Sequence, residues 1–258
     1  MELLKSNYFN TTTQAVVGSS TDTASYLFDR DTRFQYVTQG FNDDTLTASI
    51  RVNFDQTLQV SRIALVEHNL KDFTIFYNGA TASTFGLTTG GSTNASAFTS
   101  NSETSIYFTA NPVFATSVSI DMKKTITANA EKAVGFFVMT DTLRVFDRSP
   151  AAKGYKIKLD PTEVIHRLSD GGTRVQNVAD KFVVKLNYEH ITLAERDSLR
   201  TIWGNHQEMV LCPFGTMTAW DKVIFPCVWP GDFEFYQFSD DAVSAGFGGS
   251  ILLQETPR

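Results

Sequence analysis

The feature that most constrains the fold is the recurrence of short runs in which apolar and polar residues alternate, each followed by residues that favour turns. Ser49–Phe54 alternates strictly, and the more apolar Val60–Val66 is expected to be a central strand. Asp72–Tyr77 ends at Asn78–Gly79, a dipeptide suited to a tight turn. Further strands are expected at Ile106–Phe108, Ser117–Asp121 and Val134–Met139. This spacing is typical of an antiparallel β-sandwich.

A stretch rich in Pro, Gly and small residues, Asp147–Gly154, interrupts the strand pattern. A chain of 258 residues is long enough for two hydrophobic cores. We therefore predict two β-rich domains, residues 1–148 and 149–258, that meet at this stretch. In the second domain Tyr155–Leu159 is expected to form a strand that Asp160–Pro161 stops. Other strands are expected at Lys181–Tyr188, Glu208–Phe214, Lys222–Phe225, Phe233–Phe238 and Ser250–Glu255.

One segment is predicted to be a helix. Thr192 followed by Glu195 three residues later forms a capping-box pattern, and Gly204 is a natural end. We expect the helix to cover residues 193–203. Its buried face is expected to carry Leu199, Ile202 and Trp203, which share helical spacing.

Charge and hydropathy exclude two classes of partner. The net charge of −6, without any basic run, argues against nucleic-acid recognition. No segment approaches the roughly 20 apolar residues of a membrane-spanning helix. The N-terminal residues lack the apolar core of a signal peptide, so we expect synthesis in a cytoplasm.

The residues that usually hold metals or perform catalysis are scattered. The two cysteines, Cys212 and Cys227, are interpreted as small core residues on neighbouring strands, with a disulfide as the alternative. The four histidines show no metal-ligand spacing. His68–Asn69 has no nucleophile or second acid at a recognisable distance, so His68 is interpreted as structural. We predict no catalytic residue, no cofactor and no metal site, and hence no enzymatic activity.

Tyr26–Phe34, with the sequence YLFDRDTRF, precedes the alternating strand, and Val60–Asn69 follows it. This order resembles the discoidin version of the galactose-binding-like jelly roll over most of residues 10–140. Two positions depart from that family: Arg30 stands where Gly is usual, and Phe34 where Trp is usual. The resemblance implies a jelly-roll β-sandwich in which Asp29 and Asp31 could bind calcium.

We favour a metal-free corner for the same segment, because arginines alternate with its two aspartates. Phe28 and Phe34 are expected to anchor this corner in the core. A sugar-binding loop would be formed by the neighbouring residues Tyr36, Phe41, Asn42, Asp43 and Asp44. For these five residues we favour a solvated loop, because aromatic residues at strand ends usually pack inward.

The strand and helix order of the second half resembles the tail-tube-like domains of bacteriophage tail and baseplate proteins. Taken together, the two resemblances imply a mainly β protein with an N-terminal jelly-roll sandwich and a C-terminal tail-tube-like domain with one main helix. The function they imply is a structural component of a phage tail tip or baseplate in the virion, assembled as a homo-oligomeric ring with other tail proteins. The alternatives are a carbohydrate-binding module that docks a surface polysaccharide and a glycan-active enzyme.

Overall fold

The computed structural model describes residues 2–9, 16–17, 24–28, 34–78, 95–145, 155–167, 172–212, 224–240 and 246–256. Most of these residues lie in antiparallel strands, which confirms the mainly β prediction. The chain divides into two compact units, one built on Glu2–Arg144 and the other on Val145–Cys212 with Phe225–Pro257. The boundary predicted at residues 148 and 149 lies outside the described residues, and the family assignment of each domain stays a prediction.

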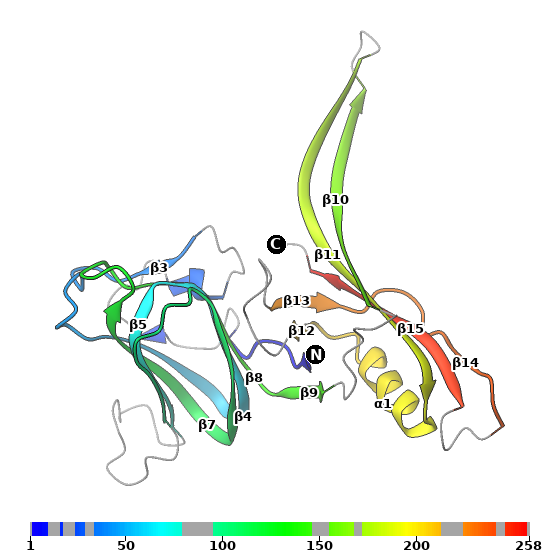
Figure 1. Ribbon diagram of the computed structural model, residues 1–258, viewed down its shortest axis with the longest axis horizontal. Helices are drawn as coiled ribbons and strands as arrows, with labels where there is room; N and C mark the ends of the chain where they lie inside the picture. Colours follow the sequence, from blue (N-terminus) through cyan, green and yellow to red (C-terminus); the bar gives the residue numbers. More distant parts are fainter. Residues whose placement is uncertain are drawn as a thin grey trace. The chain divides into compact units, whose positions relative to one another are not determined.

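The main sheet of the first unit has the strand order β3-β8-β4-β7-β5-β6, with β2 paired to β4 (Figure 1). β1 and β9 pair with each other outside this sheet. The elements are β1 (Glu2–Leu4), β2 (Val16–Val17), the 3-10 helix η1 (Ala24–Leu27), β3 (Tyr36–Val37), β4 (Ala48–His68), β5 (Leu70–Asn78), β6 (Ala95–Phe98), β7 (Ile106–Thr125), β8 (Ala133–Thr140) and β9 (Thr142–Val145).

Strands predicted as separate runs are continuous in the structure. β4 contains both Ser49–Phe54 and Val60–Val66, and β7 likewise joins two predicted runs. The register between β4 and β7 shifts between Asn53 and Leu58, which bends the pair. Buried residues from both halves of β4 belong to one core, so the two halves of the sheet enclose it from opposite sides, as in a β-sandwich.

The aromatic residues around the predicted corner divide between core and surface. Leu27 and Tyr36 are fully buried, and Phe28 is half-buried with its ring 4.9 Å from that of Phe9. Phe34 was predicted to be a core anchor, and this was wrong, because its ring is 52% exposed. It stacks at 5.5 Å on Tyr26 instead. Asp29–Arg33 lie outside the described residues, so the choice between corner and calcium loop stays a prediction.

Within the described residues the second unit has two strands, one helix and four strands, in agreement with the predicted order of two or three strands, one helix and four strands. The strand predicted at Lys222–Phe225 is displaced, because β13 begins at Phe225. Its sheet order is β10-β11-β15-β13-β12, with β14 on β15. The elements are β10 (Tyr155–Arg167), β11 (Thr173–Ile191), α1 (Leu193–Gly204), β12 (Met209–Cys212), β13 (Phe225–Val228), β14 (Phe235–Gln237) and β15 (Phe247–Glu255).

β10 continues beyond the point where it was predicted to stop. Pro161 lies inside the strand, opposite Asp180 of β11. It is tolerated because β10 is at the sheet edge, where a missing N–H need not break the ladder. β11 pairs with β15 only from Val183 onward, so the remaining parts of β10 and β11 form a two-stranded ribbon that extends beyond the sheet (Figure 1).

The helix prediction is confirmed, with one correction. The backbone N–H of Glu195 donates to Thr192 Oγ1 at 3.2 Å, and the Thr192 N–H donates to Glu195 Oε2 at 2.8 Å, which completes the capping box. Leu199 and Ile202 are buried as expected. Trp203 was expected to be buried but is partly exposed, because its ring lies against the segment after β13 rather than under the helix.

Cys212 and Cys227 are buried on the paired strands β12 and β13 and are not joined by a disulfide. This confirms their interpretation as core residues on neighbouring strands. Burial raises the pKa of the Cys227 thiol, so this side chain stays protonated and unreactive at neutral pH.

Candidate functional site

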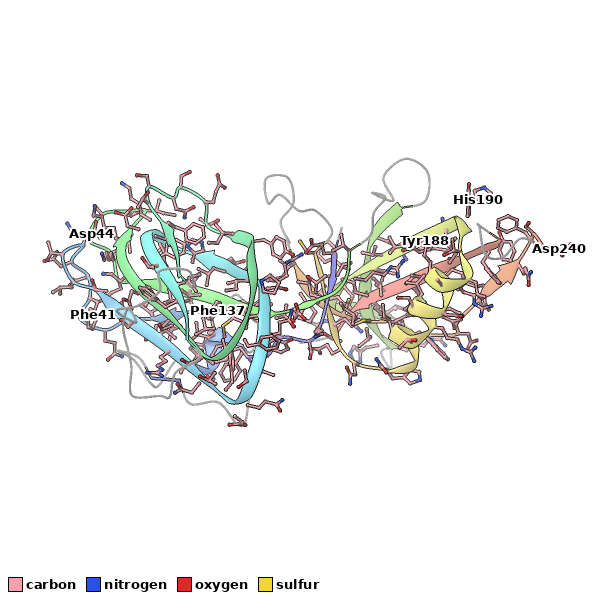
Figure 2. The ribbon with its side chains drawn as sticks, turned by 90° about the horizontal axis from the view of Figure 1, so that it is seen from below. Phe41, Asp44, Phe137, Tyr188, His190 and Asp240 are labelled. Carbon is pink, nitrogen blue, oxygen red and sulfur yellow. The ribbon has the colours of Figure 1, made fainter. Side chains whose placement is uncertain are left out.

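The predicted sugar-binding loop is held by a network of internal hydrogen bonds at one end of the first unit (Figure 2). The Glu131 carboxylate accepts from Thr38 Oγ1 at 2.9 Å and from the backbone N–H groups of Gly40 and Phe41 at 3.0 and 3.2 Å. The buried Lys132 ammonium donates to the backbone oxygen atoms of Phe41, at 2.5 Å, and Asp43, at 3.2 Å. Burial lowers the pKa of Lys132, against the opposing effect of nearby carboxylates.

The five candidate residues of this loop therefore do not form an open sugar site. Tyr36 is fully buried and Phe41 is half-buried against the core. Asp43 accepts from the N–H of Thr45, and Asp44 accepts from the N–H and hydroxyl of Thr125. Asn42 is exposed and bonds to no residue that the structure describes. The favoured interpretation, a loop whose aromatic rings pack inward, fits this geometry better.

His68 and Asn69 also have structural positions. His68 is 2% exposed, and its Nδ1 accepts from the backbone N–H of Leu70 at 3.1 Å. Burial lowers the pKa of His68 to about 4, so the imidazole is neutral at physiological pH. Asn69 bonds the backbone of Glu131 and Ala133 at 2.7 and 2.9 Å. Both side chains join loops to the strand end, which supports the structural interpretation.

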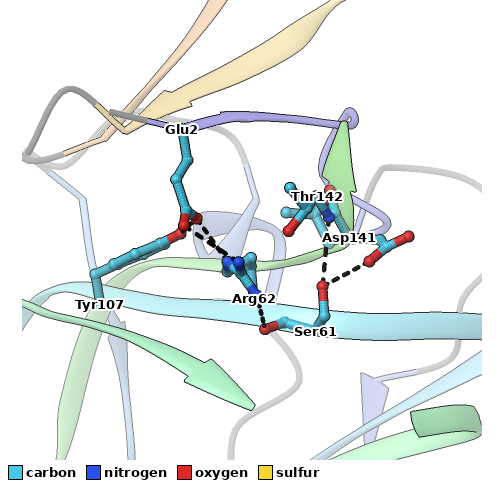
Figure 3. A network of polar contacts seen from close by, with 7 residues as sticks. Glu2, Ser61, Arg62, Tyr107, Asp141 and Thr142 are labelled. Carbon is cyan, nitrogen blue, oxygen red and sulfur yellow. Dashed lines mark hydrogen bonds and ion pairs between the residues drawn. The ribbon is translucent and has the colours of Figure 1, made fainter. Parts of the chain in front are cut away.

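A polar network fixes the N-terminal segment to β4 (Figure 3). Glu2 receives two hydrogen bonds from Arg62, at 2.6 and 3.2 Å, and one from the hydroxyl of Tyr107. Ser61 Oγ donates to Asp141 at 2.5 Å, and Lys5 pairs with the same carboxylate at 2.9 Å. Each group is satisfied by another segment of the unit, which is the arrangement of a structural tie rather than a catalytic site.

The second unit contains an open pocket of about 420 Å³, a volume in the range of small-molecule sites. One wall comes from Arg196, Arg200 and Trp203, which share one face of α1 because they are four and three residues apart. The other wall comes from Asp232, Phe233 and Phe235, on the approach to β14 and its first residue. We call this site the Trp203 pocket.

Aromatic rings form the apolar lining of the Trp203 pocket. The Phe233 ring lies 5.9 Å from that of Trp203 and 4.8 Å from that of Phe235. Trp203 is held in place because its Nε1–H donates to the backbone oxygen of Gly231 at 2.9 Å. Gly231 has a φ of 88°, a left-handed conformation that favours glycine. All three rings are half-buried, so each keeps a surface open to the pocket.

The charged side chains of the pocket differ in how firmly they are held. Arg196 donates to Asp197 at 2.6 and 3.1 Å, and its guanidinium lies 4.6 Å from the ring centre of Phe247. Arg200 and Asp232 are exposed, and neither makes a hydrogen bond or ion pair with a residue that the structure describes. These two side chains are therefore open to a ligand.

From the sequence, Trp203 was expected on the buried face of the helix, and no pocket was predicted here. A signal was present in the spacing of Arg196, Arg200 and Trp203 on the predicted helix. Among the described residues that line the pocket, only Asp232 bears a carboxylate. The described residues contain no group of three or more His, Cys, Asp or Glu side chains placed to hold a metal ion. Nor does a helix among them have the length and apolar character needed to cross a membrane.

No family model and no curated protein matches the chain. The solved structures that resemble it include chitosan-binding module 1 from a chitosanase/glucanase of Paenibacillus sp. IK-5, with 15% identity, a TM-score of 0.42, and coverage of 52% of this chain and 97% of that chain. The family 32 carbohydrate-binding module of Clostridium perfringens NanJ, in complex with galactose, has 16% identity, a TM-score of 0.38, and coverage of 50% and 93%.

The Ruminococcus gnavus GH29 fucosidase in complex with fucose has 9% identity, a TM-score of 0.41, and coverage of 53% of this chain and 27% of that chain. At these TM-scores the likenesses assign neither a ligand nor an activity to this chain. The virion role stays a prediction from the sequence.

Proposed function

We propose that this chain is a non-catalytic binding protein that recognises a polysaccharide through the Trp203 pocket. The observation that carries the proposal is the combination of three half-buried aromatic rings with exposed polar side chains at the rim. A sugar ring presents C–H groups on its faces and hydroxyl groups around its edge. The aromatic rings suit the faces, while Arg200 and Asp232 offer donors and acceptors to the hydroxyl groups.

The lining residues favour binding over hydrolysis. Glycoside hydrolysis generally uses two carboxyl groups placed on either side of the scissile bond. Asp232 is the one carboxylate among the described lining residues. We therefore also propose that the protein does not hydrolyse its ligand, and we expect a bound polysaccharide to remain uncleaved during prolonged incubation.

The test is binding to a glycan array, followed by calorimetry on the best ligand. Phe233→Ala and Phe235→Ala should each weaken binding at least tenfold, because each removes a ring from the pocket. Tyr236→Ala is the matched control, since Tyr236 follows Phe235 on β14, is 63% exposed and does not line the pocket. Equal losses for all three variants, or no binding by the wild type to any polysaccharide, would contradict the proposal.

A structural role in a phage tail tip or baseplate is a second candidate, favoured by the β10–β11 ribbon. Its outer strand β10 is an edge strand, and a two-stranded ribbon is marginally stable alone in water. Contacts between ribbons of neighbouring copies, or with other tail proteins, would build a ring in the virion. Size-exclusion chromatography with light scattering tests this role. A purified chain that stays monomeric at all concentrations, with no tail protein retained in mixtures, would argue against it.

A further inference from the structure

We propose that the Trp203 pocket selects acidic polysaccharides, with the carboxylate of a uronic acid residue bound by Arg200 and Arg196. This inference rests on the proposed polysaccharide-binding function and adds the chemical class of the ligand. It depends on the charges at the pocket rim, whereas the proposal above depends on the aromatic lining.

The first argument is the local charge. The whole chain has a net charge of −6, yet the pocket lining holds two arginines and one aspartate. The two arginines are four residues apart on α1, a spacing at which like charges repel each other. Arg196 is already paired with Asp197 at 2.6 Å, whereas Arg200 makes no ion pair with a described residue. A ligand anion beside Arg200 would supply the missing pair, so this arginine is matched to a negatively charged group.

The second argument is the geometry of the donors. The Arg196 guanidinium lies over the Phe247 ring, and its Nε and Nη2 atoms donate to Asp197, so only its Nη1 donors are left for a ligand and they are held in a fixed place. Arg200, one helical turn away, is exposed and able to orient toward a ligand. A planar guanidinium fork matches a planar carboxylate, and such charge-assisted hydrogen bonds are about twice as strong as neutral ones.

The third argument is the position of Asp232 in the opposite wall. This exposed carboxylate would repel a ligand that carries negative groups on every side. It would accept hydrogen bonds from hydroxyl groups of a sugar whose single carboxylate points toward α1. The pocket therefore suits one acidic group per sugar ring, the pattern of a polyuronate rather than of a heavily sulfated chain.

The experiment compares three oligosaccharides of equal length by calorimetry with the full chain: an oligogalacturonate, a neutral oligogalactan and a sulfated oligogalactan. We expect the oligogalacturonate to bind at least tenfold more tightly than the other two in 50 mM salt. Arg200→Gln should abolish this preference, because it should weaken binding of the oligogalacturonate at least tenfold and binding of the neutral oligogalactan by a clearly smaller factor. Arg200→Lys, which keeps the charge but loses the fork, should retain part of it. Arg174→Gln, an exposed arginine on β11 outside the pocket lining, is the control and should change nothing.

The outcomes separate the two proposals. Equal binding of neutral and acidic oligosaccharides by the wild type would overturn the acid selectivity and leave polysaccharide binding intact. Tighter binding of the sulfated ligand, or an equal loss in Arg174→Gln and Arg200→Gln, would overturn the carboxylate assignment in favour of general anion attraction. Absence of binding to all three, together with an array on which no polysaccharide binds, would overturn both proposals.

Discussion

Acidification should destabilise the first unit through His68. The side chain is 2% exposed, and its Nδ1 accepts a hydrogen bond from the Leu70 N–H. Its Nε2 has no partner among the described residues. Protonation of Nδ1 would turn the acceptor into a donor facing another donor, and it would bury a charge. The folded state therefore holds the imidazole neutral, and burial lowers its pKa from 6.5 to about 4.

The sign and size of the effect follow from this difference. The unfolded chain takes up a proton on His68 as pH falls below 6.5, while the folded chain does so only near pH 4. Stability attributable to His68 is thus fully present above pH 6.5, declines as pH falls, and levels off below about pH 4. At about 1.4 kcal/mol per pKa unit, the loss should reach about 2 kcal/mol at pH 5 and about 3 kcal/mol at pH 4.

Urea unfolding followed by circular dichroism at pH 7, 6, 5 and 4 measures this loss. His68→Gln keeps an acceptor for the Leu70 N–H but cannot titrate, so the difference between wild type and variant isolates His68. This difference in unfolding free energy should shrink as the pH falls. A pH-independent difference for His68→Gln, or an NMR titration that places the pKa near 6.5, would refute the reasoning.

Four further substitutions test the packing. Thr192→Ala should cost about 1 kcal/mol of unfolding free energy in urea melts, because the Glu195 N–H loses its capping acceptor; no loss would mean that the cap is redundant. Phe28→Ala should lower the free energy of unfolding by about 2 kcal/mol and Phe34→Ala by less than about 1 kcal/mol, because only the Phe28 ring packs on the core. The reverse ranking in thermal melts would contradict this division between a core ring and a surface ring. Lys132→Met should lower the free energy of unfolding by about 2–3 kcal/mol, because two backbone oxygen atoms lose a charged donor. Amide hydrogen exchange in residues 38–46 should become faster in this variant. Unchanged exchange would contradict the role of Lys132 in holding this loop.

The sequence predicted the elements whose signals are local. Alternation located strands that the structure confirms, and the Thr192–Glu195 pair located the start of α1 to the residue. The length of the strands was not predictable in this way. The polar residues after Phe54 interrupt the alternation but not the strand, because pairing with β7 resumes at Leu58 after a register shift.

Local sequence patterns could locate one wall of the pocket, on the predicted helix, but not the pocket itself. Arg196 and Trp203 lie on a helix, whereas Asp232 and Phe233 follow β13 about 30 residues later. Only the tertiary packing of that segment against α1 brings them together. The exposure of Trp203 has the same origin, since helical spacing placed it near the buried face but its partner, Gly231, is outside the helix. Binding sites depend on tertiary contacts of this kind, whereas strands and helices can be predicted from local sequence patterns.

Pro161 has a consequence for how β10 can associate. An exposed edge strand offers a continuous row of backbone donors and acceptors to any passing strand, which is the usual start of uncontrolled aggregation. A proline supplies no donor at its position, so Pro161 removes one of the backbone hydrogen bonds that β10 could form. Prolines in edge strands weaken pairing with a further strand. Growth of the sheet along this edge is therefore disfavoured at the centre of β10.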